Sequence, residues 1–237
     1  MKSKQPKISR LGKQAILLQW DFEIRPDYLF WLLAVRKKLK AETLKSNIQI
    51  TNTYNSLLIN YNDTIGFIYN DLVLLERLDF SLISVGELES KLFRLPVCYD
   101  KQFGLDLDEL SSRNSVSIAD IIQLHSVPIY TIYFLGFLPG FPYLGGMDER
   151  LKISRKNEPR KAVKKGAVGI AENQTGIYPK SSPAGWQIIG NCPVNLFDPK
   201  AKNPSPFSAG DRIQFYPVSK AEHEEVQSAE FQFKPES

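Results

Sequence analysis

The chain has 237 residues, of which 43% are hydrophobic and 24% charged, enough apolar material for a folded core and a composition that excludes overall disorder. Its 30 basic and 26 acidic residues leave a net charge of +4, which is not the balance of a dedicated nucleic-acid binder but permits an acidic ligand. Because the length exceeds that of a typical single domain, we expect two domains.

Residues 1–90 predict a small α/β domain. Residues 14–20 form a short apolar run, and residues 26–41 repeat apolar positions at helical spacing. Residues 46–62 give two apolar runs around the turn NTYN, and residues 63–79 again have helical spacing. The order strand, helix, strand, strand, helix, strand predicts an α+β domain of the split βαβ, ferredoxin-like kind, with two helices on one face of the sheet.

Residues 91–220 predict a mainly-β domain. A strand near residue 95 precedes two helical pieces, of which the second starts at a predicted cap formed by Ser117 with Asp120. Short apolar runs then alternate with Gly, Pro and Asn: IYTIYFLGF, AVGIAE, TGIYP, WQIIG and DRIQFYPV. This pattern is typical of an all-β barrel or sandwich, and we expect residues 221–237 to be a charged tail, either a frayed helix or disordered.

Several kinds of site lack their minimal residues. The sequence has no phosphate-binding GxxxxGK[ST] loop, no GxGxxG, no HExxH and no GxSxG. Its two histidines cannot form a multi-histidine metal site, and its two cysteines form no CxxC pair, so we expect no metal. No apolar run is long enough for a signal peptide or a membrane span, and the two unpaired cysteines suit a reducing compartment, so we expect a cytoplasmic protein with no membrane partner. The charge balance leads us to expect no nucleic-acid partner.

The stretch GFLPGFPYLGG, residues 136–146, is the most unusual motif. Glycines that permit positive φ and prolines that fix φ predict a shaped loop, which follows the strand IYTIYFL directly. Its three aromatic side chains are too apolar to be left in water, so we expect them to pack against another part of the protein or a ligand. Two interpretations remain equally open: a wall that lines a ligand cavity, or a buried loop that plugs one end of the barrel.

Three further features have a functional and a structural interpretation. Residues 176–190, GIYPKSSPAGWQIIG, predict a turn that places aromatic side chains either in a small-molecule site or in a simple hairpin. The basic run RKNEPRKAVKK, residues 155–165, is either a solvated loop or an anion site centred on Arg160. His125, at the end of a predicted helix, either carries a proton or only interacts with the helix dipole.

Together these segments resemble a known family. VCYDKQFGLDLDEL, His125, LGFLPGFPYLGG, GAVGIAENQTGIYP, SPAGWQIIG and AGDRIQFYPV are similar to the bacterial family of 5-oxoprolinase B subunits, which includes the kinase inhibitor KipI and the subunit-1-like part of allophanate hydrolase and urea carboxylase proteins. Where that family usually has PGGW, this chain has Pro183-Ala184-Gly185-Trp186. The resemblance implies a cyclophilin-like barrel behind a small α/β domain.

The resemblance also implies a function. It implies a non-autonomous subunit of an ATP-dependent enzyme that opens 5-oxo-L-proline to L-glutamate, with two partners: a homologous C subunit, of the KipA kind, and an A subunit. It implies ATP with Mg in the assembled complex, and no cofactor is evident in this chain alone. The alternatives are an inhibitor of a sensor histidine kinase, like KipI, or a subunit that acts on another small amide; a prolyl isomerase is weakly suggested by the barrel alone.

The candidate site residues follow from the same resemblance. Catalytic roles fall to Arg160, which would steady phosphate charge, and to His125, which would carry a proton or orient a group. The other candidates would bind the substrate ring or its developing oxyanion: Gly136, Phe137, Pro139, Gly140, Phe141, Gln174, Tyr178, Pro183, Gly185 and Trp186.

Overall fold

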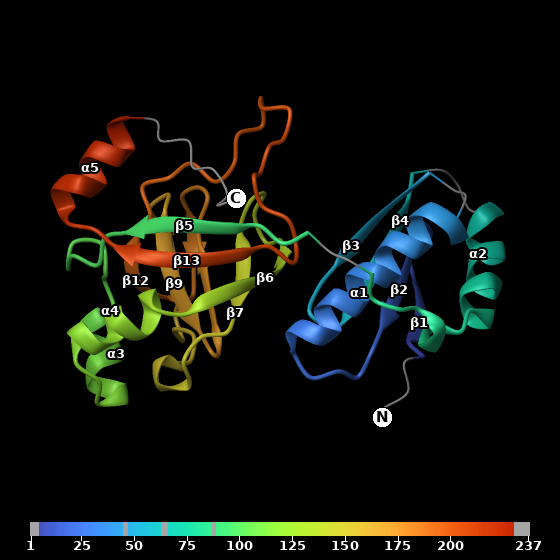
Figure 1. Cartoon of the computed structure of the whole chain (residues 1–237), viewed down its shortest axis with the longest axis horizontal. Helices are drawn as coiled ribbons and strands as arrows, with labels where there is room; N and C mark the ends of the chain where they lie inside the picture. Colours follow the sequence, from blue (N-terminus) through green and yellow to red (C-terminus); the bar gives the residue numbers. More distant parts are fainter. Residues whose placement is uncertain (1–4, 45–46, 63–65, 87–88, 230–237) are drawn as a thin grey trace. The chain divides into compact units, whose positions relative to one another are not determined.

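The computed structural model describes residues 5–44, 47–62, 66–86 and 89–229. The chain divides into two compact units, Met1–Leu88 and Glu89–Ser237, each described by itself (Figure 1). Within the described ranges, no helix combines the length and the apolar character that crossing a bilayer requires.

Unit 1 is a four-stranded antiparallel sheet with two helices. Its strands are β1 (Lys7–Leu11), β2 (Ala15–Gln19), β3 (Ile48–Asn52) and β4 (Ser56–Tyr61), in the order β1-β2-β4-β3. Helix α1 (Pro26–Lys38) runs into a π turn at Leu39–Thr43, and α2 (Gly66–Arg77) is followed by a 3₁₀ turn at Phe80–Leu82. The predicted α+β class is confirmed.

One strand of the unit 1 sheet comes from a different part of the sequence than predicted. The edge position beside β2 is filled by β1, which precedes β2 and pairs with it over its whole length. We expected that strand after the second helix, where the structure instead has the 3₁₀ turn. A strand that precedes β2 and a strand that follows the second helix could each pair with this edge of β2. The tight turn between β1 and β2 places residues 7–11 there.

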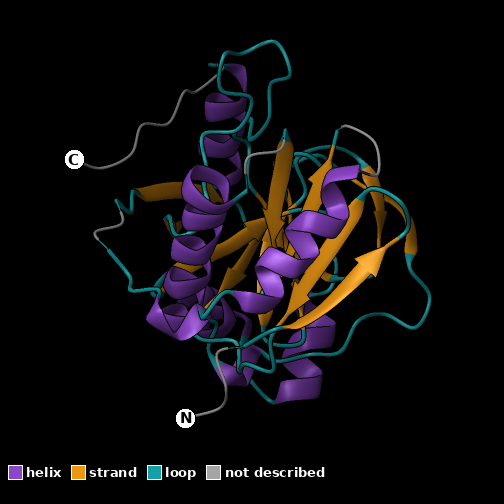
Figure 2. Cartoon of the chain, turned by 90° about the vertical axis from the view of Figure 1, so that its right-hand side faces the viewer, coloured by secondary structure: helices purple, strands orange, loops and turns teal. Residues whose placement is uncertain are grey.

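The core of unit 1 lies between the sheet and the helices (Figures 1 and 2). Alternation puts Ile16 and Leu18 of β2 on the buried face. Trp31 and Leu32 of α1 join the same apolar cluster as Leu75 of α2, so both helices cover one face, as predicted.

Unit 2 is a curled, mainly-β domain. Seven strands form one sheet in the order β12-β9-β10-β7-β6-β13-β5, and β8 pairs with β11 in a separate ribbon. The strands are β5 (Leu92–Val97), β6 (Ile129–Leu135), β7 (Pro142–Gly145), β8 (Arg160–Val163), β9 (Ala167–Ala171), β10 (Gln174–Ile177), β11 (Ser182–Ala184), β12 (Gln187–Asn191) and β13 (Arg212–Pro217). The strands expected from the apolar runs are all present.

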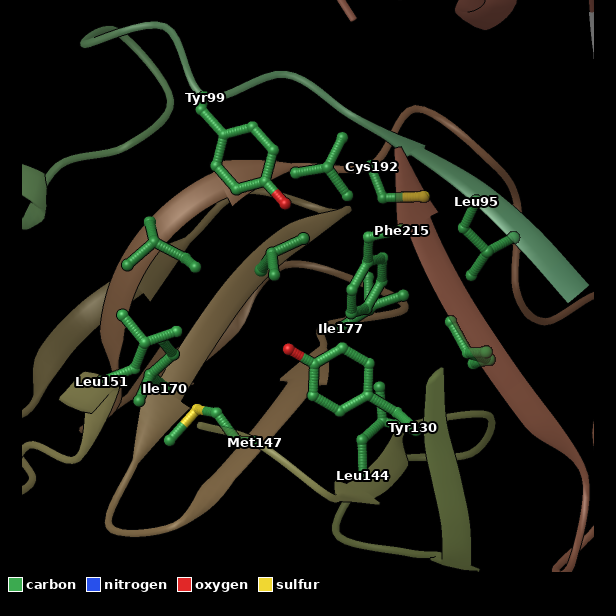
Figure 3. Close-up of a cluster of buried hydrophobic side chains, with 14 of the residues drawn as sticks. Leu95, Tyr99, Tyr130, Leu144, Met147, Leu151, Ile170, Ile177, Cys192 and Phe215 are labelled. Carbon is green, nitrogen blue, oxygen red and sulfur yellow. The ribbon is translucent and has the colours of Figure 1, made fainter. Parts of the chain in front are cut away.

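The two edges of this sheet meet. Cys98, just after β5, exchanges two backbone hydrogen bonds with Asn191 at the end of β12, with N···O distances of 2.9 and 3.0 Å. The contact joins the first and last strands of the sheet and closes the barrel at that end. Figure 3 shows the core side chains inside, among them Leu95, Tyr130 and Phe215.

Three helices flank the barrel: α3 (Leu107–Asn114), α4 (Ile118–Ser126) and α5 (Lys220–Ser228), with a 3₁₀ turn at Glu149–Leu151. The predicted cap of α4 is confirmed, because the Ser117 hydroxyl accepts from the Asp120 N–H at 3.1 Å.

Helix α5 lies in the segment that we expected to be a charged tail. Ser219 and Glu222 form a reciprocal capping box at its start. Its His223 is buried, with Nε2 2.8 Å from Oδ1 of Asn191. Val226 packs against the barrel core as well, so a capped start and these packed side chains give the polar segment a defined place on the barrel.

Candidate functional site

The loop between β6 and β7 is a compact turn held by its own backbone. The N–H groups of Gly136, Leu138 and Phe141 donate to carbonyls within the loop, at 2.7 to 3.1 Å. Since Pro139 has no N–H, only the N–H groups of Phe137 and Gly140 are not used inside the turn. Gly140 has φ +83° and lies so close to Phe197 that a Cβ would be 2.8 Å from Phe197 Cβ.

Phe141 anchors the loop in an aromatic cluster. Its ring is fully buried and meets Tyr178 and Trp186 edge to face, with centroid distances of 5.0 and 5.4 Å. Tyr143 is 5.8 Å from Trp186. The loop aromatics therefore pack on the aromatic residues of the segment 176–190, and both sequence motifs form one cluster.

A pocket of about 400 Å³ opens beside this cluster. Phe137 lies at its edge, 62% exposed and in the left-handed backbone region at φ 63°, an unfavourable conformation for a phenylalanine. Its ring is 6.3 Å from that of Tyr178. The remaining lining residues are Leu138, Phe141, Tyr143, Arg155, Pro159, Ser182, Pro183, Ala184, Gly185 and Trp186.

The polar side-chain groups of the pocket are two phenols, the Ser182 hydroxyl, the Trp186 indole N–H and the Arg155 cation. Burial raises the pKa of Tyr178 to about 12, with the nearby Tyr143 adding to the rise and Arg155 opposing it. Burial also raises the pKa of Tyr143, again opposed by Arg155. Both phenols therefore stay protonated near neutral pH, and the Arg155 charge reaches each of them.

Arg160 lies outside this pocket, in an ion cluster around Asp106. The Asp106 carboxylate is 2% exposed; its Oδ1 accepts from Arg160 Nη2 at 2.5 Å and from Lys156 Nζ at 3.1 Å. Its Oδ2 accepts from the N–H of Ile188 at 2.6 Å. Lys156 also contacts Glu109 at 3.0 Å. This cluster fixes the segment before β8 to the barrel, and Arg160 Nη1 is buried without a hydrogen-bond partner among the described residues.

His125 also lies outside the pocket, in the barrel core. Thr175 donates its hydroxyl proton to the Gly169 carbonyl at 3.0 Å, so it accepts from His125 Nε2–H at 2.9 Å. Nδ1 is then the acceptor for the Tyr99 hydroxyl at 2.7 Å. The ring stacks on Phe215 at 4.7 Å, and complete burial lowers its pKa to about 3. His125 is therefore a neutral, fully enclosed imidazole.

The structure brings six of the predicted site residues together in the pocket: Phe137, Phe141, Tyr178, Pro183, Gly185 and Trp186. Gly136, Pro139, Gly140 and Gln174 are near these elements in sequence but do not line it, and neither do His125 and Arg160. Ala184, the departure from the family pattern, lies in β11 without positive φ, so the alanine puts no strain on the backbone there.

Sequence reasoning missed Arg155, Tyr143 and Asp106. Arg155 is the first residue of the basic run that we centred on Arg160, and Tyr143 belongs to the quoted loop, so the motifs already contained both residues. Asp106 gave no signal, because its partners lie 50 or more residues further along the chain.

Comparison with known proteins identifies the family. Residues 6–207 match the model of the carboxyltransferase domain, subdomain C and D. The chain belongs to this family. The 5-oxoprolinase B subunit of Bacillus subtilis is 43% identical over 58% of this chain and 57% of its own length. The 5-oxoprolinase B subunit of Haemophilus influenzae is 42% identical over 60% of this chain and 68% of its own length.

The match thus spans little more than half the length of the Bacillus subtilis relative. A solved structure shows the same fold over the whole chain. The urea amidolyase of Kluyveromyces lactis superposes with a TM-score of 0.81 over 100% of this chain and 16% of its own, at 19% identity. At that identity the likeness concerns the fold alone, and it supports the predicted α+β and mainly-β architecture.

Proposed function

We propose that the chain is a subunit of an ATP-dependent 5-oxoprolinase, which opens 5-oxo-L-proline to L-glutamate together with partner A and C subunits. The two relatives above are both named as the B subunit of 5-oxoprolinase. The observation that carries the proposal is the aromatic pocket, because it offers, within this chain, a site of suitable size and chemistry for a small cyclic amide.

The pocket suits the ring of 5-oxoproline. The flat five-membered lactam has apolar methylenes that pack on aromatic faces, here those of Phe137, Tyr178 and Trp186. The N–H group of Phe137, which lines the pocket and is not used inside the loop, is the candidate for binding the lactam oxygen. We propose that this subunit holds the lactam in a fixed orientation and shields one face of it from water.

The energy for ring opening comes from ATP in this proposal. An unactivated lactam is a poor electrophile, and ATP, when bound to the assembly, supplies a phosphoryl group that makes the lactam oxygen a leaving group. The described residues gather no group of three or more His, Cys, Asp or Glu side chains fit to hold a metal ion. The lining of the aromatic pocket includes no carboxylate that could bind Mg²⁺, and we propose that the partner subunits contribute most of the Mg-nucleotide site.

The two catalytic roles predicted from the sequence stay predictions. Arg160 is already paired with Asp106, although its Nη1 has no partner among the described residues, and His125 is enclosed in the core. Arg160→Ala, assayed in the assembled enzyme, tests the phosphate role, which fails if activity is unchanged.

The proposal is tested by measuring glutamate release from 5-oxo-L-proline, with and without ATP, by this chain alone and with the A and C subunits of the same genome. We expect ATP-dependent release only when all three are present. Phe137→Ala removes an exposed wall of the pocket and should lower kcat/KM by roughly tenfold. Leu105→Ala, at a similarly exposed apolar residue outside the pocket, is the matched control.

Two results would contradict the proposal. If folded, associated subunits release no glutamate, the substrate is another small amide or the chain regulates a kinase as KipI does. If Phe137→Ala and Leu105→Ala have the same activity as the unaltered enzyme, the aromatic pocket is not where the lactam binds.

A further inference from the structure

Arg155 differs from Lys156 and Arg160 of the same basic run because its charge has no carboxylate partner among the described residues. Lys156 pairs with Asp106 and Glu109, and Arg160 pairs with Asp106. Arg155 is exposed and forms no ion pair with any carboxylate of the described ranges. It lies at the pocket, with its Cζ 6.0 Å above the ring of Trp186. Within the described part of the chain, the pocket thus has an unneutralised guanidinium at an otherwise aromatic and neutral wall.

The position of Arg155 is fixed from both sides. Before it, Ile153 forms a β-bridge with Glu172. After it, the N–H of Lys156 donates to the Gly185 carbonyl at 2.8 Å, and the Lys156 ammonium is held by Asp106. The backbone of Arg155 is therefore anchored beside the Gly185-Trp186 turn. A guanidinium held in place by its backbone and by a ring face loses less conformational freedom when it binds an anion.

The chemistry of the pocket specifies a kind of ligand. Apolar and aromatic walls favour a small flat body, and a single unpaired guanidinium favours one anionic group at the end of that body. Arginine binds a carboxylate through two parallel N–H···O bonds, a geometry that a lysine does not reproduce. A cyclic amide that carries a carboxylate satisfies both requirements, whereas the same ring without the carboxylate satisfies only the first.

We propose that Arg155 binds the carboxylate of the substrate and thereby selects carboxylated lactams over neutral ones. This inference rests on the proposed function, because it assigns one end of the substrate within the same pocket. Arg155 is then a specificity-determining residue, distinct from Arg160, whose charge is neutralised within the Asp106 cluster.

The test compares two ligands and three variants in the assembled enzyme. 5-Oxo-L-proline is the substrate, and 2-pyrrolidinone, the same lactam without the carboxylate, is the competitive inhibitor. We expect Arg155→Ala to raise KM for 5-oxo-L-proline roughly 10- to 100-fold, the loss of a charge-assisted hydrogen-bonded pair, and to leave the Ki of 2-pyrrolidinone within about twofold. Arg155→Lys should recover only part of the loss, since it keeps the charge without the paired geometry.

Arg212→Ala is the matched control, because Arg212 is an exposed arginine of the same unit that does not line the pocket. If Arg155→Ala leaves KM unchanged in an active enzyme, the inference is wrong and the proposed function stands. An equal rise of KM and of the Ki of 2-pyrrolidinone also overturns it, because Arg155 would then shape the pocket rather than bind the carboxylate. If the unaltered enzyme shows no activity, the proposed function fails first.

Discussion

His125 should make the stability of unit 2 depend on pH between neutrality and about pH 3. In the folded protein the buried imidazole is neutral, and burial lowers its pKa from the ordinary 6.5 to about 3. In the unfolded chain the same ring regains its ordinary pKa of about 6.5. Between these two values the unfolded state binds more protons than the folded state, so the free energy of unfolding falls as the pH falls.

The size of the effect follows from this difference. Well below pH 6.5 the loss approaches about 1.4 kcal/mol per pH unit, because one proton is bound on unfolding. Between pH 7.5 and pH 5.0 it amounts to about 2 kcal/mol, a large part of the stability of a typical domain. Only histidines have ordinary pKa values inside this interval, and the chain has two of them.

Urea unfolding of unit 2 can be followed by its two thiols. Cys98 and Cys192 are the only cysteines of the chain, and both are free and buried in unit 2. A short pulse of a pyridyl disulfide, which reacts with thiols at both pH values, labels them in molecules whose unit 2 has unfolded. The labelled fraction against urea concentration gives the free energy of unfolding at pH 7.5 and at pH 5.0.

The decisive comparison uses His125→Gln. The variant loses stability at pH 7.5, because the Tyr99 and Thr175 contacts change, but its further loss between pH 7.5 and pH 5.0 should be smaller by about 2 kcal/mol. His223→Gln is measured alongside, because burial also lowers the pKa of that histidine and its share of the pH dependence has to be separated from that of His125. If His125→Gln keeps the full pH dependence of the unaltered chain, His125 is not a buried neutral group and the reasoning is refuted.

Three further predictions test the packing around the site. Asp106→Asn should destabilise unit 2 by about 2 to 4 kcal/mol in the same thiol assay, because two partly buried cations lose their carboxylate; a change below about 0.5 kcal/mol would contradict the role of this cluster. Gly176→Ala should cost about 1 to 3 kcal/mol, because its Cβ would lie 2.8 Å from Phe141 Cζ and from the Pro142 carbonyl; unchanged stability would show that the loop can move aside. Ser219→Ala should weaken α5 by about 1 kcal/mol through loss of its capping box, seen as faster hydrogen exchange at residues 220–228; unchanged exchange would mean that the contacts of His223 alone hold the helix.

Local patterns predicted most of the architecture. Apolar runs between Gly, Pro and Asn predicted the strands of the barrel, and helical spacing predicted α1 and α2. The position of β1 at the sheet edge depends on pairing rather than on local pattern, so the sequence could not decide it. The start of α5 carried a readable signal, Ser219 followed by Glu222, within a segment whose overall polarity favoured a tail.

The site was predictable where its residues belong to two neighbouring motifs. Phe141 comes from the quoted loop, and Tyr178 and Trp186 come from the segment 176–190. Each lies directly next to the end of a strand, Phe141 before β7, Tyr178 after β10 and Trp186 before β12, and their rings meet edge to face. The surroundings of His125 and Arg160 were not predictable. Tyr99 and Thr175 form hydrogen bonds with His125, and Asp106 forms an ion pair with Arg160. These partners are far apart in the sequence and meet only in the folded barrel.

The central claim, that the aromatic pocket binds the lactam, is tested most directly at the tryptophan side chains. The chain has three, Trp186 in the pocket and Trp20 and Trp31 in the core of unit 1, so an indole ¹⁵N spectrum has one reporter and two internal controls. We predict that 5-oxo-L-proline, added to the labelled chain in complex with its partner subunits, shifts the Trp186 resonance and leaves the other two in place. A complex that converts 5-oxo-L-proline while its Trp186 resonance stays unchanged at saturating substrate would contradict the account.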